Sequence, residues 1–301
     1  MTRRPAVGYA LVSGSFLTWG SLGALVRMTT MPESALIVAR MTIAALLVGA
    51  VFVRRPLLAE LRDRRQLGRL LLMGVFSAST ILLFFIALRL AGVAVGMFLL
   101  FTGPVYVSLI APRLLGERPD RVVYPALGLS VAGMAAILVP ALLGGARASL
   151  AGVACGLATG FLYAGYSLTA KVLTRTLRSA TIALSEMVID AVVLLPLAAW
   201  QVVSSGYRPS RGDLVVTVVI AVACTAIPYV TYVEGLRRIR VEHAAILGYL
   251  EPVSAPLYAL VLLGESTTPA TVAGGALIVA AGVLVVVFGS PQLEPPEAVV
   301  V

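Results

Sequence analysis

Residues 88–117 read LRLAGVAVGMFLLFTGPVYVSLIAPRLLGE, and residues 236–265 read LRRIRVEHAAILGYLEPVSAPLYALVLLGE. The two stretches lie 148 residues apart and are identical at 12 of 30 positions, including a proline near the middle and a shared Leu-Leu-Gly-Glu ending. Unrelated apolar segments match far less often, so the chain is expected to contain two copies of one unit. We predict that Pro104 in the first copy, and Pro252 with Pro256 in the second, interrupt one helix in each copy.

The composition around these stretches excludes a soluble globular protein. Hydrophobic residues make up 59% of the chain and charged residues 12%, with a mean hydropathy of +1.00, whereas soluble domains carry about 45–50% apolar and about 25% charged residues. So few charges cannot cover a water-exposed surface, and the apolar excess must therefore face lipid. The net charge of +9 does not indicate nucleic-acid binding, because all but one of the Lys and Arg residues lie between or at the ends of apolar runs.

These apolar runs predict membrane-spanning helices. A bilayer core about 30 Å thick requires roughly 17–25 predominantly apolar residues per helix. Cutting the chain at charge clusters and at Gly/Pro turns gives ten such segments: residues 7–26, 33–53, 67–88, 92–111, 122–142, 150–170, 179–202, 214–236, 244–263 and 270–288. Residues 289–301, with three prolines and two glutamates, are predicted to form a disordered tail.

The positive charges predict the orientation of these segments. With the N-terminus in the cytoplasm, 17 of the 23 Lys and Arg residues fall on the cytoplasmic side and 5 outside, and Arg40 lies within a span. Both termini are then cytoplasmic. Each copy, residues 7–142 and 150–288, holds five helices, and an odd number requires the second copy to be inverted. The expected fold is an all-α polytopic membrane protein of ten transmembrane helices in two inverted five-helix repeats, an arrangement typical of alternating access around a midplane site.

Ionisable side chains within the predicted spans are the main candidates for function, because each costs about 2.5–3.5 kcal/mol at mid-helix unless it has a partner or a wet cavity. Four residues qualify: Arg40, Glu186, Asp190 and Glu251. Glu186 and Asp190 share one helix face, where we expect one of the two carboxyls to be protonated at neutral pH. Two interpretations stay open. Either Arg40 and Asp190 form a buried pair between the halves, or these side chains meet a zwitterionic substrate or carry a coupling proton.

Glu251 is the strongest single candidate. It follows a run of apolar residues, glycine and one tyrosine and precedes Pro252, which places it near the midplane, where the proline frees backbone acceptors. Its counterpart in the first copy is Gly103, so the two copies differ at this point. The alternative interpretation is a protonated carboxyl that donates to a freed carbonyl and stabilises the kink.

Aromatic side chains within the spans predict the walls of a pocket. Trp19 and Tyr163 are related by the repeat, as are Phe101 and Tyr249, and none of the four lies at a membrane interface, where an aromatic belt would place it. Such a pocket suits a small amphipathic solute better than a sugar phosphate, which would require several cationic side chains. Generic core packing is the alternative for each of these residues.

Several polar residues near the predicted helix ends are expected to be structural. Glu234 precedes Arg237 and Arg238 at helical spacing, which predicts an ion pair at the membrane surface. His243 is expected at the same surface. The Gly-Glu pairs at residues 116–117 and 264–265 predict left-handed helix caps followed by a glutamate that opens the next helix.

Over nearly its whole length the sequence also resembles the EamA-like transporters of the drug/metabolite transporter superfamily. The resemblance lies in Trp19-Gly20, in Arg40, in Gly103-Pro104 through Leu115-Gly116-Glu117, and in Glu251-Pro252 through Leu263-Gly264-Glu265. It implies ten helices around a central cavity and the export of amino acids, other metabolites or drugs from bacteria. The expected location is the bacterial inner membrane.

The expected function is therefore a secondary transporter that exports amino acids or related small metabolites by alternating access. Multidrug or quaternary-ammonium efflux is the alternative, and an intramembrane enzyme acting on lipid-linked substrates is a remote one, because no nucleophile motif or metal site supports it. The sequence has no Walker motif and no histidine or cysteine cluster of ligand type. The expected partners are a small-molecule substrate and the lipid bilayer, without ATP, nucleic acid, metal or other cofactor, for a monomer or homodimer.

Overall fold

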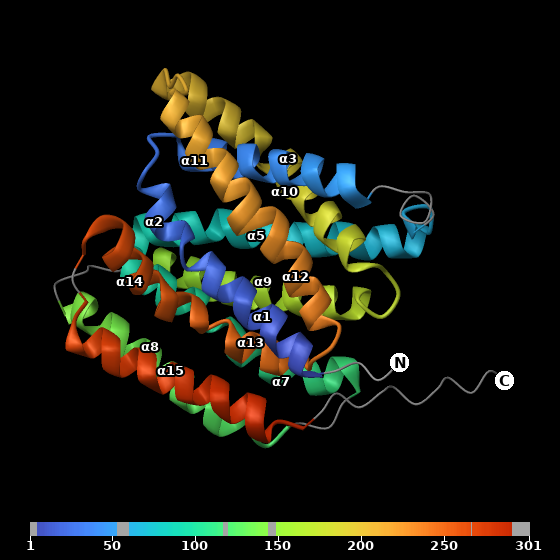
Figure 1. Cartoon of the computed structure of the whole chain (residues 1–301), viewed down its shortest axis with the longest axis vertical. Helices are drawn as coiled ribbons and strands as arrows, with labels where there is room; N and C mark the ends of the chain where they lie inside the picture. Colours follow the sequence, from blue (N-terminus) through green and yellow to red (C-terminus); the bar gives the residue numbers. More distant parts are fainter. Residues whose placement is uncertain (1–4, 53–59, 117–119, 144–148, 266, 291–301) are drawn as a thin grey trace.

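The computed structural model describes residues 5–52, 60–116, 120–143, 149–265 and 267–290. All regular structure in these ranges is helical (Figure 1). In chain order the elements are α1 (Pro5–Trp19), α2 (Leu22–Val26), α3 (Glu33–Phe52), α5 (Arg64–Ala91), α6 (Val93–Leu100), α7 (Gly103–Leu115), α8 (Val123–Leu143), α9 (Leu150–Leu173), α10 (Ser179–Ser205), α11 (Arg211–Ala221), the π-helix η1 (Val222–Ala226), α12 (Ile227–Leu236), α13 (Val241–Leu247), α14 (Leu250–Leu263) and α15 (Pro269–Phe288).

Nine helical segments of the described ranges are long and apolar enough to cross a bilayer, and α8 contributes a shorter apolar helix over Val123–Leu138. The observed helix ends lie within four residues of the predicted ones, and the largest difference is at the end of α7, Leu115. The chain is thus an all-helical, polytopic membrane protein. The predicted tail beyond residue 290, together with Val53 and Glu117, lies outside the described residues.

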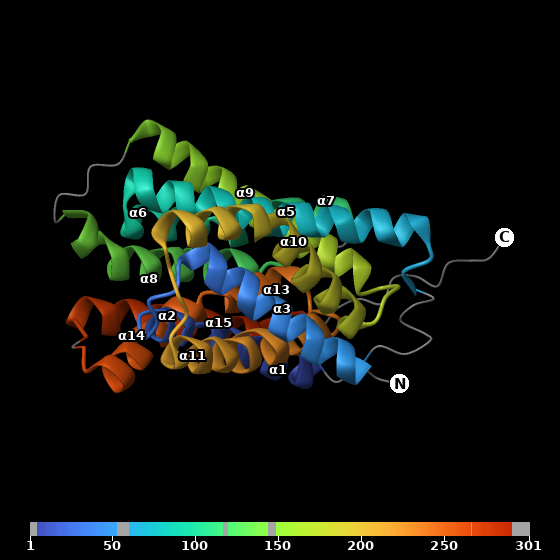
Figure 2. The ribbon, with the colours of Figure 1, turned by 90° about the horizontal axis from the view of Figure 1, so that it is seen from above.

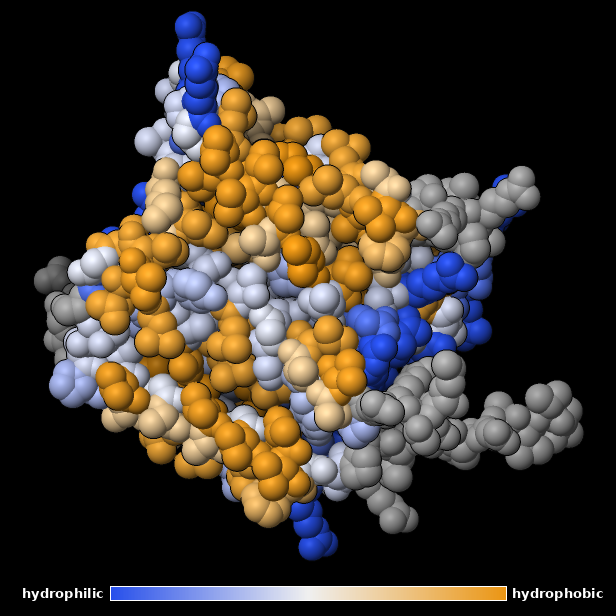
Figure 3. All heavy atoms as spheres, in the orientation of Figure 1, coloured by the Kyte–Doolittle hydropathy of each residue, from blue (hydrophilic) through white to orange (hydrophobic). Residues whose placement is uncertain are grey.

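The outer surface of the bundle is apolar, as a lipid-facing surface requires. Large hydrophobic side chains project from many helices, and Val203 and Val261 are 81% and 78% exposed. Figure 3 shows broad hydrophobic areas on the visible face and hydrophilic side chains gathered toward the end at which α1 begins. We call this the basal end; α1 and α13 begin there, and α7 and α12 end there.

Four helix pairs make the main contacts of the bundle: α5 with α9, α8 with α15, α3 with α10, and α1 with α12. Figure 2 shows α5 and α9 along one face and α1 and α11 along the opposite one. Glycines allow the closest approaches. A Cβ on Gly133 would lie 2.5 Å from the carbonyl oxygen of Gly274, so α8 and α15 touch backbone to backbone.

The helix contacts have the same two-fold pattern as the sequence. When each helix of residues 7–142 is replaced by its counterpart in residues 150–288, and the reverse, pairs in contact become other pairs in contact. The exchange converts the α5–α9 pair into α12–α1, and the α7–α9 pair into α14–α1, and both members of each set are in contact. The α3–α10 and α8–α15 pairs each join corresponding helices of the two sequence copies. Packing and sequence repetition therefore follow the same division of the chain.

Two helix interruptions lie 147 residues apart, within one residue of the 148-residue sequence repeat. Between α6 and α7 the chain leaves the helix at Phe101 and Thr102, and between α13 and α14 it does so at Gly248 and Tyr249. Pro104 is the second residue of the helix that follows, where its missing N–H needs no partner. Corresponding left-handed glycines, Gly116 (φ 68°) and Gly264 (φ 70°), follow α7 and α14.

Two further interruptions have no counterpart in the sequence predictions. The first separates α1 from α2 after Trp19, and the second is the π-helix η1, which joins α11 to α12. A π-helical turn holds one extra residue and shifts the backbone hydrogen bonds, and such turns are frequent at functional sites. Trp19, at the first interruption, and Tyr229, three residues after the π-helix, line the cavity described below.

Candidate functional site

A cavity of about 260 Å³ lies between the two halves of the chain, near the middle of their helices. Residues from α1, α2, α3, α5, α6, α7, α9, α10, α12 and α14 form its walls. On the side of the basal end, buried apolar residues such as Val12, Met73, Val107 and Leu173 belong to one continuous core. This core separates the cavity from the basal end.

Eight of the 18 described residues that line the cavity are aromatic. They are Phe16, Trp19, Phe84, Phe101, Tyr163, Tyr166, Tyr229 and Tyr232. Trp19, Phe101 and Tyr163 were expected there from the sequence. Tyr249 was expected too, but it lies behind the wall, where it is fully buried, stacks on Phe101 at 5.7 Å between ring centroids and donates a hydrogen bond to its carbonyl oxygen. Tyr249 thus supports Phe101 and does not line the cavity.

The unpredicted π-helix holds Trp19 in place. The indole Nε1 of Trp19 donates a hydrogen bond of 2.9 Å to the carbonyl oxygen of Cys224, which lies in η1. Its ring also meets the ring of Tyr229 edge to face, with the centroids 5.4 Å apart. An acceptor in a second helix, supplied by irregular backbone, therefore fixes the orientation of the largest side chain in the wall.

Arg40 brings a cation to the cavity wall. Its side chain comes from the middle of α3, and the residue is only 8% exposed. The possible ion pair with Asp190 does not form, and among the described residues Arg40 makes no hydrogen bond or ion pair at all. A buried guanidinium normally has partners that satisfy its donors, so its donors are available to a ligand in the cavity.

Glu251 brings a carboxylate to the same cavity. Helix α14 begins one residue earlier, at Leu250, and the backbone N–H of Glu251 donates to the carbonyl oxygen of Gly248. Its side chain lines the cavity and makes no hydrogen bond or ion pair within the described part of the chain. The alternative expectation, a carboxyl bound to a carbonyl freed by Pro252, does not match this geometry.

Glu186 and Asp190 lie side by side on α10, and both are buried. The hydroxyl of Ser77 lies 2.9 Å from Oδ2 of Asp190 and 3.5 Å from Oε1 of Glu186. The hydroxyl of Tyr166 donates to Oε2 of Glu186 at 2.9 Å. Glu186 and Ser77 line the cavity, whereas Asp190 lies behind them and is 0% exposed.

The three prolines expected at the helix breaks have different positions. Pro104 lines the cavity, and Pro252 is buried in the first turn of α14. Pro256 lies inside α14, where the helix continues past it to Leu263. Within the described residues there is no group of three or more His, Cys, Asp and Glu side chains that could hold a metal ion. The cavity is therefore suited to binding a solute through a cation, carboxylates and aromatic faces.

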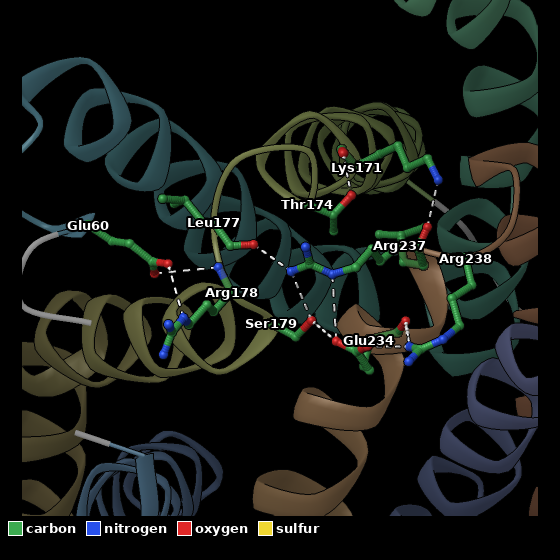
Figure 4. A network of polar contacts seen from close by, with 10 residues as sticks. Glu60, Lys171, Thr174, Leu177, Arg178, Ser179, Glu234, Arg237 and Arg238 are labelled. Carbon is green, nitrogen blue, oxygen red and sulfur yellow. Dashed lines mark hydrogen bonds and ion pairs between the residues drawn. The ribbon is translucent and has the colours of Figure 1, made fainter. Parts of the chain in front are cut away.

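The basal end holds a second group of charged side chains, which form ion pairs and hydrogen bonds with one another (Figure 4). As predicted, Glu234 forms ion pairs with Arg237, at 3.6 Å, and with Arg238. Arg237 also donates to the carbonyl oxygen of Leu177, and the hydroxyl of Ser179 donates to Glu234. These contacts join the end of α12 to the beginning of α10.

His243 lies at the basal end, near the beginning of α13, but it is buried between helices and not exposed. It is 0% exposed, and its ring nitrogens lie 2.9 Å from Oδ2 of Asp120 and 2.7 Å from the hydroxyl of Tyr9. Burial favours a higher pKa for Asp120, but hydrogen bonds from the backbone N–H groups of Ser290 and Val122 and from His243 outweigh it and lower the pKa. The polar ring is buried because it has partners on both sides.

Three further ionisable residues are buried beside His243. Arg240 and Glu242 form an ion pair of 2.8 Å, and both are 2% exposed. Lys171 is 0% exposed and donates to the carbonyl oxygens of Leu236, at 2.6 Å, and Ile239, at 2.5 Å. We refer to Asp120, Lys171, Arg240, Glu242 and His243 as the basal cluster.

At the opposite end, Glu265 does not open the next helix, contrary to expectation. Helix α15 begins only at Pro269, with Thr268 as its N-cap. Glu265 instead forms an ion pair of 2.6 Å with Arg27, which follows α2. Both side chains are largely exposed, so the pair is worth little energetically.

Comparison with known proteins gives matches over most of the chain. The family model of the EamA-like transporter family matches residues 6–139 and again residues 150–288. An uncharacterized transporter of Archaeoglobus fulgidus is 30% identical over 226 residues, which cover 74% of this chain and 76% of the relative. YwfM of Bacillus subtilis, also named an uncharacterized transporter, is 28% identical over 217 residues, covering 72% of each chain.

A relative with a named substrate is the threonine/homoserine exporter RhtA of Escherichia coli strain K12. It is 28% identical over 212 residues, which cover 70% of this chain and 68% of RhtA. A crystal structure of a protein whose description gives no function superposes with a TM-score of 0.79 at 20% identity, covering 94% of this chain and 98% of the other. At that identity, the similarity establishes a shared fold.

Proposed function

Because the chain belongs to the EamA-like transporter family, we propose that it exports amino acids or related small metabolites across the bacterial inner membrane by alternating access. It is a multi-pass membrane transporter and not an enzyme, as the family and the transporter names of its relatives indicate. The proposal concerns the solute, the direction of transport and the mechanism.

The observation that carries the proposal is the pair of opposite charges in one aromatic cavity. Arg40 and Glu251 both line it, and neither has an ion pair among the described residues. A guanidinium binds a carboxylate through two parallel hydrogen bonds. A carboxylate and aromatic faces attract an ammonium group. An α-amino acid carries both groups, so it would satisfy both charged side chains at once.

The size of the cavity supports a small solute. Pockets for drug-sized ligands hold about 300–1,000 Å³, and this cavity holds about 260 Å³. Trp19, Phe101 and Tyr163 would enclose the side chain of the solute, and Glu186 would add a second acceptor near its ammonium group. The RhtA relatives, named threonine and homoserine exporters, fit this substrate class.

We further propose that the chain has ten transmembrane helices in two inverted repeats, residues 7–142 and 150–288, with both termini in the cytoplasm. Three observations support this: the family model matches twice, the helix contacts map onto themselves on exchange, and the paired helix breaks lie 147 residues apart, within one residue of the sequence repeat. Rocking of one repeat against the other would open the cavity to each side in turn.

Multidrug or quaternary-ammonium efflux is the second candidate, since Glu251 and the aromatic wall could bind an organic cation. Arg40 opposes that interpretation, because a guanidinium without an ion pair in the same cavity repels a permanent cation. The zwitterionic solute therefore accounts for more of the cavity than the cationic one.

The decisive experiment measures exchange of labelled L-threonine, then of other amino acids, in proteoliposomes that contain the purified full-length chain. We expect uptake above that of empty vesicles, and a loss of about tenfold or more for Glu251→Gln, because a charge-assisted hydrogen bond contributes about 1.5–3 kcal/mol. Glu265→Gln, a change in an exposed ion pair outside the cavity, is the matched control and should retain exchange.

Two results would contradict the proposal. One is uptake no better than that of empty vesicles across a broad panel of amino acids. The other is transport of ethidium or tetraphenylphosphonium that requires Glu251 and is not inhibited by amino acids. The second result would establish the efflux alternative.

A further inference from the structure

We propose that Glu186, Ser77 and Asp190 form a proton-binding site beside the cavity, which holds one proton and exchanges it for the ammonium group of the solute. The role in coupling rests on the proposed function. The binding of the proton does not, because it follows from the hydrogen bonds of the three side chains.

The hydrogen-bond geometry favours a proton beyond those of the described donors, because one hydroxyl lies between two carboxyls. The Ser77 hydroxyl has a single hydrogen, yet its oxygen lies 2.9 Å from Oδ2 of Asp190 and 3.5 Å from Oε1 of Glu186. If both carboxyls were ionised, one of these oxygens would face a hydroxyl lone pair. A proton on Glu186 completes the chain, because Glu186 then donates to Ser77 and Ser77 donates to Asp190.

The carboxyl oxygens that do not face Ser77 lead to the same conclusion. Oε2 of Glu186 accepts from the hydroxyl of Tyr166, whereas Oδ1 of Asp190 is buried and has no hydrogen-bond partner among the described residues. Two carboxylates in this position would place two negative charges on one buried helix face with two donors between them. Such a pair in low dielectric retains a shared proton, because the second ionisation would leave an unpaired buried charge.

No neighbouring helix supplies a cation in contact with the pair. The titratable and charged groups that face it are Arg40 on α3, Tyr166 on α9, Tyr229 and Tyr232 on α12, and Glu251 across the cavity. Arg40 forms no ion pair with either carboxyl, and the part of α5 that faces α10 contributes only the hydroxyl of Ser77. Arg40 attracts both carboxylates without contacting them, and a bound proton removes one of the two negative charges of the pair.

The site lies where a solute could displace this proton. Glu186 and Ser77 line the cavity, whereas Asp190 does not. When an ammonium group approaches Glu186, the carboxyl O–H bond breaks, the proton passes to water in the cavity, and the carboxylate pairs with the ammonium. Reversal on the other side of the membrane restores the O–H bond. One proton would thus move in the direction opposite to each solute molecule.

The bound proton can be measured without any substrate. The infrared spectrum of the purified protein at neutral pH should contain the carbonyl band of one protonated carboxyl that is absent from the double variant Glu186→Gln/Asp190→Asn. Ser77→Ala should retain the band but shift its frequency, because one hydrogen bond is lost. Asp63→Asn, an exposed N-cap carboxylate replaced in the same way, should leave the band unchanged. Equal carboxyl bands in the wild type and the double variant would overturn the proposal.

Coupling is measured in proteoliposomes with the membrane potential clamped. An acidic interior should drive accumulation of labelled L-threonine by about tenfold per pH unit at one proton per solute. Asp190→Asn should lose this accumulation, and its threonine–threonine exchange is measured beside it, so that loss of coupling is distinguished from loss of transport. Asp63→Asn should keep both activities.

The outcomes separate the two proposals. Exchange without any drive from the pH gradient would overturn the coupling and leave the proposed function intact. Full pH-driven accumulation in Asp190→Asn would also overturn it and assign the proton elsewhere, with Glu251 as the remaining cavity carboxyl. If the wild type exchanges no amino acid, the proposed function fails, and the infrared comparison alone decides whether the pair binds a proton.

Discussion

The cavity and the basal cluster bury charges to a similar depth, but they satisfy them differently. Arg40 in the cavity wall is 8% exposed and has no ion pair within the described residues, whereas Arg240 in the basal cluster is 2% exposed and pairs with Glu242 at 2.8 Å. Likewise, the side chain of Glu251 has no hydrogen-bond partner in the described structure, while Lys171 donates to two backbone carbonyls.

This difference distinguishes charged side chains that stabilise the fold from charged side chains that are available to bind a ligand. Burying an ionised group is costly unless partners replace its lost hydration. The basal cluster meets this requirement with side chains and backbone atoms of several helices, so it stabilises the closed end of the bundle. The cavity meets it only when a solute is bound. The comparison can be tested by removing charges from each region.

The largest effect on stability is expected in the basal cluster. Arg240→Met should lower the free energy of unfolding by about 3–5 kcal/mol, because it removes an ion-pair partner of the buried Glu242. Chemical unfolding of the detergent-solubilised protein measures this loss.

The double variant Arg240→Met/Glu242→Leu is the control for that prediction. It removes both charges and should recover most of the lost stability, since apolar residues can replace a buried pair at little cost. If the double variant were as unstable as Arg240→Met, the cost would come from packing of the Arg240 stem and not from the lost ion pair.

In the cavity we expect a smaller effect, which lowers the affinity for the solute and leaves the stability unchanged. Arg40→Gln should reduce the apparent affinity for L-threonine by about 10- to 100-fold, because a charged hydrogen-bond donor contributes about 1.5–3 kcal/mol. Stability should not fall, since no ion pair in the described structure is broken. Exchange kinetics and thermal unfolding in the same detergent measure the two quantities. A marked loss of stability with unchanged affinity would place Arg40 among the structural charges.

Much of the difference between the cavity and the basal cluster could be predicted from the sequence, because a charged residue within an apolar segment is easily identified. Arg40, Glu186 and Glu251 were chosen as ionisable residues within apolar spans, and all three line the cavity. The ion pair of Glu234 with Arg237 and Arg238 followed from helical spacing and is confirmed. Both results rest on local patterns that a single helix contains.

Features that depend on contacts between distant helices could not be predicted. His243 looked like a surface residue because its partners, Tyr9 and Asp120, lie 234 and 123 residues away in the chain. The π-helix that holds Trp19 gave no signal, since its residues are as apolar as those of a regular helix. Tyr249 was placed in the wall because hydropathy does not distinguish a wall residue from the one behind it.

The smallest effect concerns Asp120 and depends on pH. Its pKa is lowered in the folded protein, because the hydrogen bonds from Ser290, Val122 and His243 outweigh the effect of burial. A carboxyl with a lowered pKa contributes stability above its ordinary pKa of about 3.9 and loses that contribution as the pH falls through its lower folded value. Wild type should therefore exceed Asp120→Asn in thermal stability at pH 5–7, by about 1 kcal/mol for the weakened hydrogen bonds.

Lowering the pH should narrow this gap, because protonation of Asp120 makes the wild-type side chain neutral like asparagine. Below about pH 4 the two melting temperatures should converge. Arg40→Gln tests whether the change belongs to the basal cluster, since its stability relative to wild type should not show the same convergence. A difference in melting temperature between wild type and Asp120→Asn that is constant down to pH 3 would mean that Asp120 stabilises the fold through its shape alone. The charges of the basal cluster would then contribute less to stability than the comparison with the cavity implies.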